Sequence, residues 1–160
     1  MSSWSHSNPP QGSKEPVVYV VDDDESMRLA LDGLLRSIGL QVQTFDSTQA
    51  FLVCARRDVP GCLVLDVRLR GESGLAFQEQ MEKSGVRMPI VFMTGHGDIA
   101  MTVKAMKAGA VDFLAKPFRD QDMLDAVASA LARDGARLQA EQSGAALRQA
   151  FEALTPRERE

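Results

Sequence analysis

Four apolar segments of this chain end in side chains that could take part in phosphate chemistry. The first runs into three consecutive aspartates, the second into one aspartate, and the later two into a hydroxyl and an ammonium group. Carboxylates held close together repel one another, so one of them takes up a proton or the group binds a cation. Oxygen ligands suit a hard divalent ion such as Mg²⁺. The side chains at these ends are Asp22, Asp23 and Asp24, then Asp66, Thr94 and Lys116.

Asp66 is the predicted reactive group, because a carboxylate is a competent nucleophile towards phosphorus and gives an aspartyl phosphate. The transferred group spreads negative charge over its oxygens, so it needs a metal, an ammonium and hydroxyl or amide donors around it. Lys116 and Thr94 supply the ammonium and the hydroxyl, and the Gly95 amide is a further donor. The predicted metal ligands are Asp22, Asp23 and Asp66.

Taken alone, Asp66 has another interpretation. Aspartate is a favoured N-cap, so a single aspartate after a strand is more typical of the start of the next helix. The convergence of four such ends on one edge of a sheet reverses this preference, because the carboxyl edge of an open parallel sheet is where ligands bind.

The side chains can meet only if the apolar segments are parallel strands of one sheet. Short β-rich runs alternate five times with helical patterns, which indicates an α/β fold with a doubly wound five-stranded parallel sheet. Right-handed crossovers then bring all carboxyl ends of the strands to one edge. The predicted strands are 17–21, 40–45, 62–66, 89–93 and 111–115, and the predicted helices are 26–38, about 47–57, 74–83, 99–107 and 120–133.

Local signals set the predicted helix ends. Glycines at three positions are placed for left-handed caps, and Asp98 is a plausible N-cap for the fourth helix. In the second helix the residues expected to face inward are Ala50, Phe51, Val53 and Cys54. The three glycines are Gly39, Gly85 and Gly109.

Composition places the chain among ordinary globular proteins. It has 160 residues, 44% of them hydrophobic, and a formal net charge of −4, which is too mild to imply a nucleic-acid-binding surface or an acidic tail. Cys54 and Cys62 lie in apolar segments and are expected to stay reduced in a cytoplasmic protein. No run is long enough to span a membrane, and no signal pattern precedes the first strand, so we expect no membrane contact. Residues 1–15 are expected to be a disordered lead.

Beyond residue 134 the pattern changes. Residues 135–153 are rich in Ala, Gln, Glu and Leu with a thin apolar stripe, which predicts a linker helix that extends the fifth helix or pairs with a partner. Residues 154–160 contain Thr155, Pro156 and Glu158, a capping-box pattern that predicts the start of a further helix. We therefore expect a domain boundary here, after a first domain spanning 16–134.

Residues 17–133 resemble the receiver domain of two-component response regulators. The matching motifs are Val-Val-Asp22-Asp23-Asp24, Leu-Asp66-Val-Arg-Leu, Phe-Met-Thr94-Gly-His-Gly and Lys116-Pro-Phe. The resemblance implies that Asp66 accepts phosphate from a phosphohistidine of a sensor histidine kinase. It also implies Mg²⁺, or Mn²⁺ or Ca²⁺ in its place, bound by Asp23, Asp66 and the Arg68 backbone carbonyl, with Asp22 acting through water.

Within this family, the segments after Thr94 and around Met106 are similar to the FixJ group, and residues 154–160 are similar to the opening of a LuxR-type helix-turn-helix domain. The resemblance implies a transcription regulator that dimerises on phosphorylation and binds promoter DNA through a domain outside this sequence. Phe113 matches the aromatic switch position, which turns inward with Thr94; simple core packing is the alternative. The implied dimer face carries Ile99, Val103, Met106, Lys107 and Ala110.

The sequence departs from the family pattern after Asp66, where Leu69-Arg70 replaces the usual Met-Pro. Loss of the proline is expected to loosen the loop that positions the Arg68 carbonyl. The position of Arg68 faces the phosphoryl group in the family, so its guanidinium is expected to alter autodephosphorylation, unless it is simply a solvated side chain.

A phosphatase similar to haloacid dehalogenases is the alternative function. Asp22 and Asp24 have the two-residue spacing that such enzymes use for nucleophile and acid/base, and Thr94 and Lys116 follow in a compatible order. This interpretation leaves Asp66 without a role and finds no acidic pair at a strand end after Lys116. The receiver interpretation, a switch rather than an enzyme, is therefore preferred.

Overall fold

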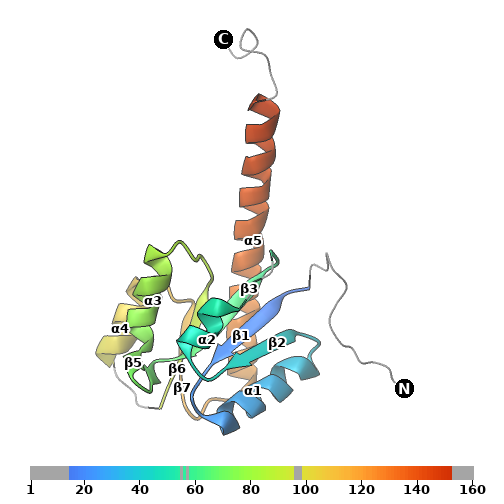
Figure 1. Cartoon of the computed structure of the whole chain (residues 1–160). Helices are drawn as coiled ribbons and strands as arrows, with labels where there is room; N and C mark the ends of the chain where they lie inside the picture. Colours follow the sequence, from blue (N-terminus) through green and yellow to red (C-terminus); the bar gives the residue numbers. More distant parts are fainter. Residues whose placement is uncertain (1–14, 55, 57, 96–98, 153–160) are drawn as a thin grey trace.

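Strands and helices alternate along the chain in the computed structural model, which describes residues 15–54, 56, 58–95 and 99–152 (Figure 1). The predicted cap Asp98, residues 154–160 and the predicted lead apart from Glu15 lie outside these residues. The described elements are β1 (Val17–Val21), α1 (Glu25–Ser37), β2 (Gln41–Phe45), α2 (Thr48–Val53), β3 (Gly61–Asp66), β4 (Arg68–Leu69), β5 (Glu72–Ser73), α3 (Gly74–Lys83), β6 (Ile90–Thr94), α4 (Ile99–Lys107), β7 (Asp112–Ala115) and α5 (Asp120–Glu152).

The central sheet has the strand order β2-β1-β3-β6-β7, and all of its strands are parallel. From β1 the chain moves outward to β2 on one side and then to β3 on the other. The boundary between β1 and β3 is therefore the topological switch point, where open α/β sheets bind ligands. The doubly wound five-stranded parallel sheet is confirmed.

Two apolar cores lie on the two faces of this sheet, because successive strand side chains point to opposite sides. One core packs residues such as Val20 and Val64 against α1 and α5, and the other packs Tyr19 and Leu65 against α2, α3 and α4. Burial on both faces explains why β1 and β3 read as unbroken apolar runs rather than alternating ones.

α2 is shorter than predicted. Ser47 caps it by accepting a hydrogen bond from the Ala50 amide, and the helix ends at Val53, with Cys54 already extended. Phe51 is buried, as expected, but Val53 is 84% exposed, so its predicted inward orientation is wrong. Two residues apart on a helix, the two side chains point about 200° away from each other.

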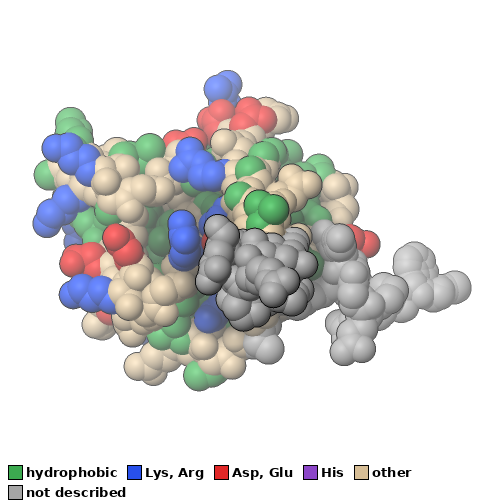
Figure 2. Space-filling view, turned by 90° about the horizontal axis from the view of Figure 1, so that it is seen from above, with side chains coloured by type: hydrophobic (Ala, Val, Ile, Leu, Met, Phe, Trp, Pro, Cys, Tyr) green, Lys and Arg blue, Asp and Glu red, His purple; other side chains and the backbone are tan. Residues whose placement is uncertain are grey.

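α5 continues through the predicted linker. The predicted extension of the fifth helix is confirmed, because the helix runs without a break past the expected end near Arg133, through Gly135 to Glu152, and projects far beyond the sheet (Figure 1). A glycine inside a helix costs about 1 kcal/mol relative to alanine, which contacts on either side of Gly135 can offset. Figure 2 looks down the axis of α5 from the side to which its C-terminal part projects. On this face of the molecule, Lys and Arg side chains gather on the side of α3 and α4.

A two-stranded hairpin follows β3 and was not predicted. Arg68 pairs with Ser73 and Leu69 with Glu72, around a turn of Arg70 and Gly71. Gly71 has φ +78°, a conformation that glycine adopts without strain in such turns. The absence of proline was expected to loosen this segment, but the structure pairs its two sides as short strands.

The predicted glycine caps are confirmed, since Gly39, Gly85 and Gly109 all have positive φ angles just after helices. In the described part of the chain, no helix has the length and apolar character needed to cross a bilayer.

Candidate functional site

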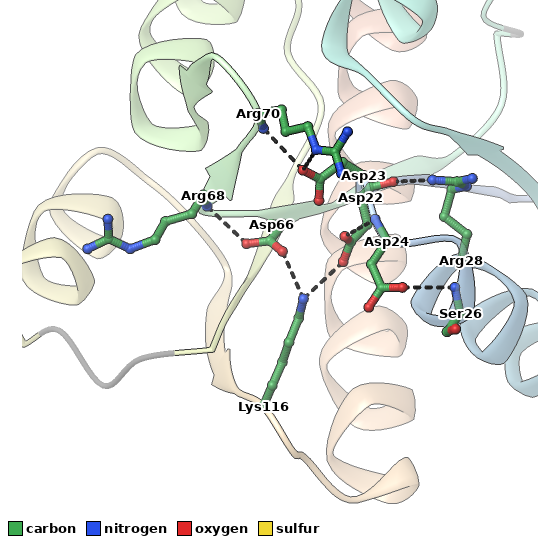
Figure 3. Close-up of polar contacts among 9 residues, drawn as sticks. All are labelled: Asp22, Asp23, Asp24, Ser26, Arg28, Asp66, Arg68, Arg70 and Lys116. Carbon is green, nitrogen blue, oxygen red and sulfur yellow. Dashed lines mark hydrogen bonds and ion pairs between the residues drawn. The ribbon is translucent and has the colours of Figure 1, made fainter.

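The carboxyl ends of β1 and β3 bring the acidic residues together at the switch point. Val21 pairs with Leu65 in the parallel register, so the next residues, Asp22 and Asp66, are neighbours. One oxygen each from Asp22, Asp23 and Asp66 lies within 4.8 Å of the others. The predicted carboxylate cluster therefore exists in the structure (Figure 3).

Lys116 places its ammonium group between two of these carboxylates. Its Nζ lies 2.8 Å from Asp66 Oδ2 and 3.0 Å from Asp22 Oδ2. The residue follows β7, and its amide donates to the Thr94 carbonyl at 2.7 Å, which fixes the start of the side chain; the Lys116–Pro117 peptide is cis. Burial by itself lowers the pKa of the ammonium, but the hydrogen bonds to Asp66 and Asp22 outweigh it and raise the pKa.

Asp22 is fully buried. Its Oδ1 accepts a hydrogen bond from the Asp24 amide at 2.9 Å, while Oδ2 faces Lys116. Burial raises the pKa of this carboxyl, and the Asp24 amide and Lys116 only partly counter it. Asp22 and Asp66 thus share one largely buried ammonium, with the Asp23 carboxylate beside them, and a divalent cation would neutralise this surplus of negative charge.

Asp66 is the last residue of β3 and is 7% exposed. Its Oδ1 accepts a hydrogen bond from the Arg68 amide at 2.9 Å, and its Oδ2 faces Lys116. Both carboxylate oxygens therefore have hydrogen-bond partners within the site. The alternative role as a helix cap is wrong, because Ser73 is the residue that caps α3, through its hydroxyl and the Leu75 amide. Asp66 is therefore held at the sheet edge by the cluster itself.

Two residues that support the site were not predicted. The Arg28 guanidinium donates to the Asp22 carbonyl at 2.7 Å and ties α1 to the end of β1. Gly74 lies so close to the end of β3 that a Cβ there would stand 2.6 Å from the Asp66 carbonyl oxygen. The only sequence signals were an arginine one turn into α1 and a glycine at the start of α3.

Thr94, the predicted hydroxyl donor, ends β6 and is buried. Its neighbour Met93 pairs with Asp66 in the parallel register, so Thr94 stands one residue beyond the level of Asp66 on the adjoining strand. Gly95 follows and is exposed. Phe113, the predicted switch residue, is half-buried, with its ring centroid 6.0 Å from that of Phe92. The roles of these residues stay predictions.

Arg68 and Arg70 both extend away from Asp66 (Figure 3). The Arg68 guanidinium reaches towards α4 and lies 3.9 Å from Met101 Sδ. Arg70 instead meets Asp23: its amide donates to Asp23 Oδ2 at 3.2 Å, and its Nε lies 3.8 Å from the same oxygen. This contact with the acidic cluster was not predicted.

The predicted dimer face is apolar and exposed along α4, with one exception. Ile99, Val103 and Met106 are 80%, 46% and 41% exposed, and Lys107 is exposed as well. Ala110 is only 5% exposed, so its assignment to this surface is wrong. Its amide donates to the Ala105 carbonyl beyond the Gly109 turn, which carries its side chain into the core.

Comparison with known proteins identifies this arrangement. The model of the response regulator receiver domain matches residues 18–128, a stretch that holds Asp22, Asp23, Asp66, Thr94 and Lys116. The chain belongs to the response regulator receiver family. It is 53% identical to nodulation protein W of Bradyrhizobium diazoefficiens over 148 residues, 92% of this chain. It is 43% identical to the transcriptional regulatory protein FixJ of the same organism, covering 89% of this chain and 70% of that protein.

Solved receiver structures share the fold. The response regulator StyR superposes with a TM-score of 0.85 at 51% identity, covering 90% of this chain and 73% of the StyR chain. The chain spans 65% of the length of nodulation protein W and 51% of the response regulator TodT of Pseudomonas putida. The match is therefore to the receiver part of larger regulators.

Proposed function

We propose that Asp66 accepts a phosphoryl group from a phosphohistidine of a sensor histidine kinase. An Asp66 carboxylate oxygen attacks phosphorus, the phosphorus–nitrogen bond breaks, and the imidazole leaves with the bonding electron pair. The observation that carries this proposal is the shared Lys116 ammonium between Asp66 and Asp22, within a cluster of three carboxylates. The chain is then a switch rather than an enzyme that turns over a separate substrate.

The surplus carboxylates fit a divalent cation. Asp23 and Asp66 would hold Mg²⁺ directly, with the Arg68 carbonyl as a further ligand and Asp22 acting through water; Mn²⁺ or Ca²⁺ can take its place. When bound, the cation supplies positive charge next to the phosphoryl oxygens. Lys116 neutralises a second part of that charge, and the Thr94 hydroxyl and Gly95 amide donate hydrogen bonds to the oxygens.

The geometry disfavours the phosphatase alternative with Asp22 as nucleophile. Asp22 is fully buried, and its two oxygens accept from the Asp24 amide and Lys116. An attacking oxygen needs an approach to phosphorus. Asp66 also has both oxygens bonded, but its side chain keeps 11% exposure, whereas that of Asp22 has none.

Incubation with acetyl phosphate and Mg²⁺, followed by peptide mapping, tests the acceptor. We expect the modification at Asp66 and its complete loss in Asp66→Asn, while Asp32→Asn on the surface of α1 stays modified. Modification at Asp22 would instead support the phosphatase, and no modification at any aspartate would contradict the proposed function.

The exposed apolar surface of α4 is proposed to convert phosphorylation into dimerisation. Phosphorylated Asp66 would draw in Thr94 and Phe113, and the exposed Ile99, Val103 and Met106 would then bury one another in a symmetric homodimer. A dimer would place two DNA-binding domains on paired half-sites of a promoter in the cytoplasm.

Sedimentation with beryllofluoride tests this output. We expect the wild type to dimerise and Val103→Glu to stay monomeric, because a charge would be buried at the interface. Val53→Glu is the matched control: Val53 is an equally apolar, exposed residue on α2, and this variant should still dimerise. A Val103→Glu dimer would contradict the assigned face.

Arg68 is proposed to slow the hydrolysis of the aspartyl phosphate. Its guanidinium rests near Met101 and would have to turn towards Asp66 to pair with the phosphate or to obstruct water. In Arg68→Ala the half-life of the phosphorylated protein should shorten; an unchanged half-life would show that Arg68 is only a solvated side chain.

A further inference from the structure

Arg70 stands in the turn of the β4–β5 hairpin beside the most accessible carboxylate of the cluster. The side chain of Asp23 is 28% exposed, compared with 11% for Asp66 and none for Asp22. Asp23 is therefore the ligand that an incoming cation meets first. Both contacts of Arg70, from the amide at 3.2 Å and from Nε at 3.8 Å, fall on a single oxygen, Asp23 Oδ2.

The two contacts differ in how firmly they are held. The amide belongs to a paired hairpin, and the Thr48 hydroxyl at the start of α2 bonds to the Glu72 carboxylate on the returning strand. The amide donor is therefore fixed in place beside Asp23. The guanidinium, by contrast, is on a side chain that is 92% exposed and can swing into solvent at little cost.

Charge at this position acts directly against cation binding. In the structure, Lys116 partners Asp22 and Asp66, and Arg70 partners Asp23, so each carboxylate already faces a positive group. A divalent cation that binds Asp23 must displace the guanidinium or sit beside it, and like charges repel. Removing the guanidinium removes this competitor and leaves all three carboxylates unchanged.

We propose that Arg70 sets the divalent-cation affinity of the acidic site by competing with the cation for the Asp23 carboxylate. The inference rests on the proposed function, in which this site binds Mg²⁺. Arg70 is a position where the sequence leaves the pattern of its family. The proposed role of Arg70 is to lower the cation affinity of the unphosphorylated site. The exposure of the guanidinium limits the effect to a few-fold.

Titration of isotope-labelled protein with MgCl₂, followed through backbone amide resonances, tests the proposal. Arg70→Ala keeps the amide and removes the guanidinium, so its dissociation constant for Mg²⁺ should fall roughly two- to fourfold at low salt. Arg70→Gln, similar in length but uncharged, should give the same fall, and Arg70→Lys should stay near the wild type. Arg119→Ala is the control: its exposed guanidinium pairs with Asp122, and the dissociation constant should not change.

Salt separates a charge effect from a structural one. Because ions screen exposed charges, the difference between Arg70→Ala and the wild type should shrink at about 1 M monovalent salt. Equal dissociation constants for the wild type, Arg70→Ala and Arg70→Gln at low salt would overturn the role of Arg70 while leaving the Mg²⁺ site intact. If Mg²⁺ shifts no amides near Asp23 and Asp66 even in the wild type, the proposed function itself fails.

Discussion

Two buried aspartate sites stand at opposite edges of the same sheet, and they differ in how their charge is matched. At the amino edge, Asp134 of α5 is 2% exposed and accepts the Gly61 amide and Arg137 Nε, both at 2.8 Å. The Arg137 guanidinium also donates a hydrogen bond to the Glu141 carboxylate, one turn further along α5. One buried carboxylate therefore meets one guanidinium and one backbone donor, and both of its oxygens have partners.

At the carboxyl edge the matching is incomplete. Asp22 and Asp66 share Lys116, and the neighbouring Asp23 meets only the exposed Arg70 guanidinium. Burial raises the pKa of Asp22 even with the ammonium beside it. The amino edge differs. Partial burial by itself lowers the pKa of Arg137, but the hydrogen bonds that Arg137 makes to Asp134 and Glu141 outweigh burial and raise that pKa. A balanced buried charge holds elements together, whereas an unbalanced one costs stability and is ready for a ligand.

The largest effect is expected where the charge is balanced. Asp134→Ala leaves the Gly61 amide and Arg137 without their acceptor, so the free energy of unfolding should fall by about 3 kcal/mol in urea titrations. Glu141→Ala, which removes only exposed pairs, should change it by less than about 0.5 kcal/mol. A loss below about 1 kcal/mol in Asp134→Ala would remove the contrast between the two edges.

Lys116→Met should lower the free energy of unfolding by about 2 kcal/mol at neutral pH, because two buried carboxylates lose their common cation. The variant also predicts a pH dependence. Burial already raises the pKa of Asp22, and without the ammonium it rises further. The folded state then binds a proton more tightly than the unfolded state, so its stability falls as pH rises through the raised pKa. The deficit relative to the wild type should therefore narrow on acidification; a deficit that widens would contradict the assignment.

Asp23→Asn should act in the opposite direction to Asp134→Ala. It removes one of the mutually repelling carboxylates, and its remaining oxygen can still accept the Arg70 amide. Without divalent cations, we expect the free energy of unfolding to rise by about 0.5–1 kcal/mol. Thermal unfolding should also lose most of its response to Mg²⁺. Asp32→Asn, on an exposed pair with Arg36, provides the baseline and should not be stabilised; if Asp23→Asn is destabilised, the carboxyl edge carries no surplus charge.

The fold was predictable because its signals are local. Runs such as Val17 to Val21 and Cys62 to Leu65 are too apolar for any place except the middle of a sheet, and their last residues then converge by topology alone. Parallel register places Asp22 next to Asp66 without any information about side-chain contacts.

Other features depend on contacts between distant segments. Helical periodicity does not reveal that Asp134 accepts the Gly61 amide, 73 residues away. The errors at Val53 and Ala110 are different, because local geometry decides both: Val53 lies about 200° around the helix from Phe51, and the Gly109 turn directs Ala110 into the core. Arg70 meets Asp23 only because the hairpin carries it back across the sheet edge, and no sequence spacing shows that pairing.

The continuous α5 gives the molecule a rigid extension. At about 1.5 Å per residue, roughly 21 Å separate Asp120, next to the Lys116 loop, from Asp134, and a further 27 Å or so extend from there to Glu152. The first part is held along its length, because Met123, Val127 and Ala130 are buried in the core and Asp134 accepts the Gly61 amide. Since the helix is unbroken, anything joined to its far part takes its direction from the sheet.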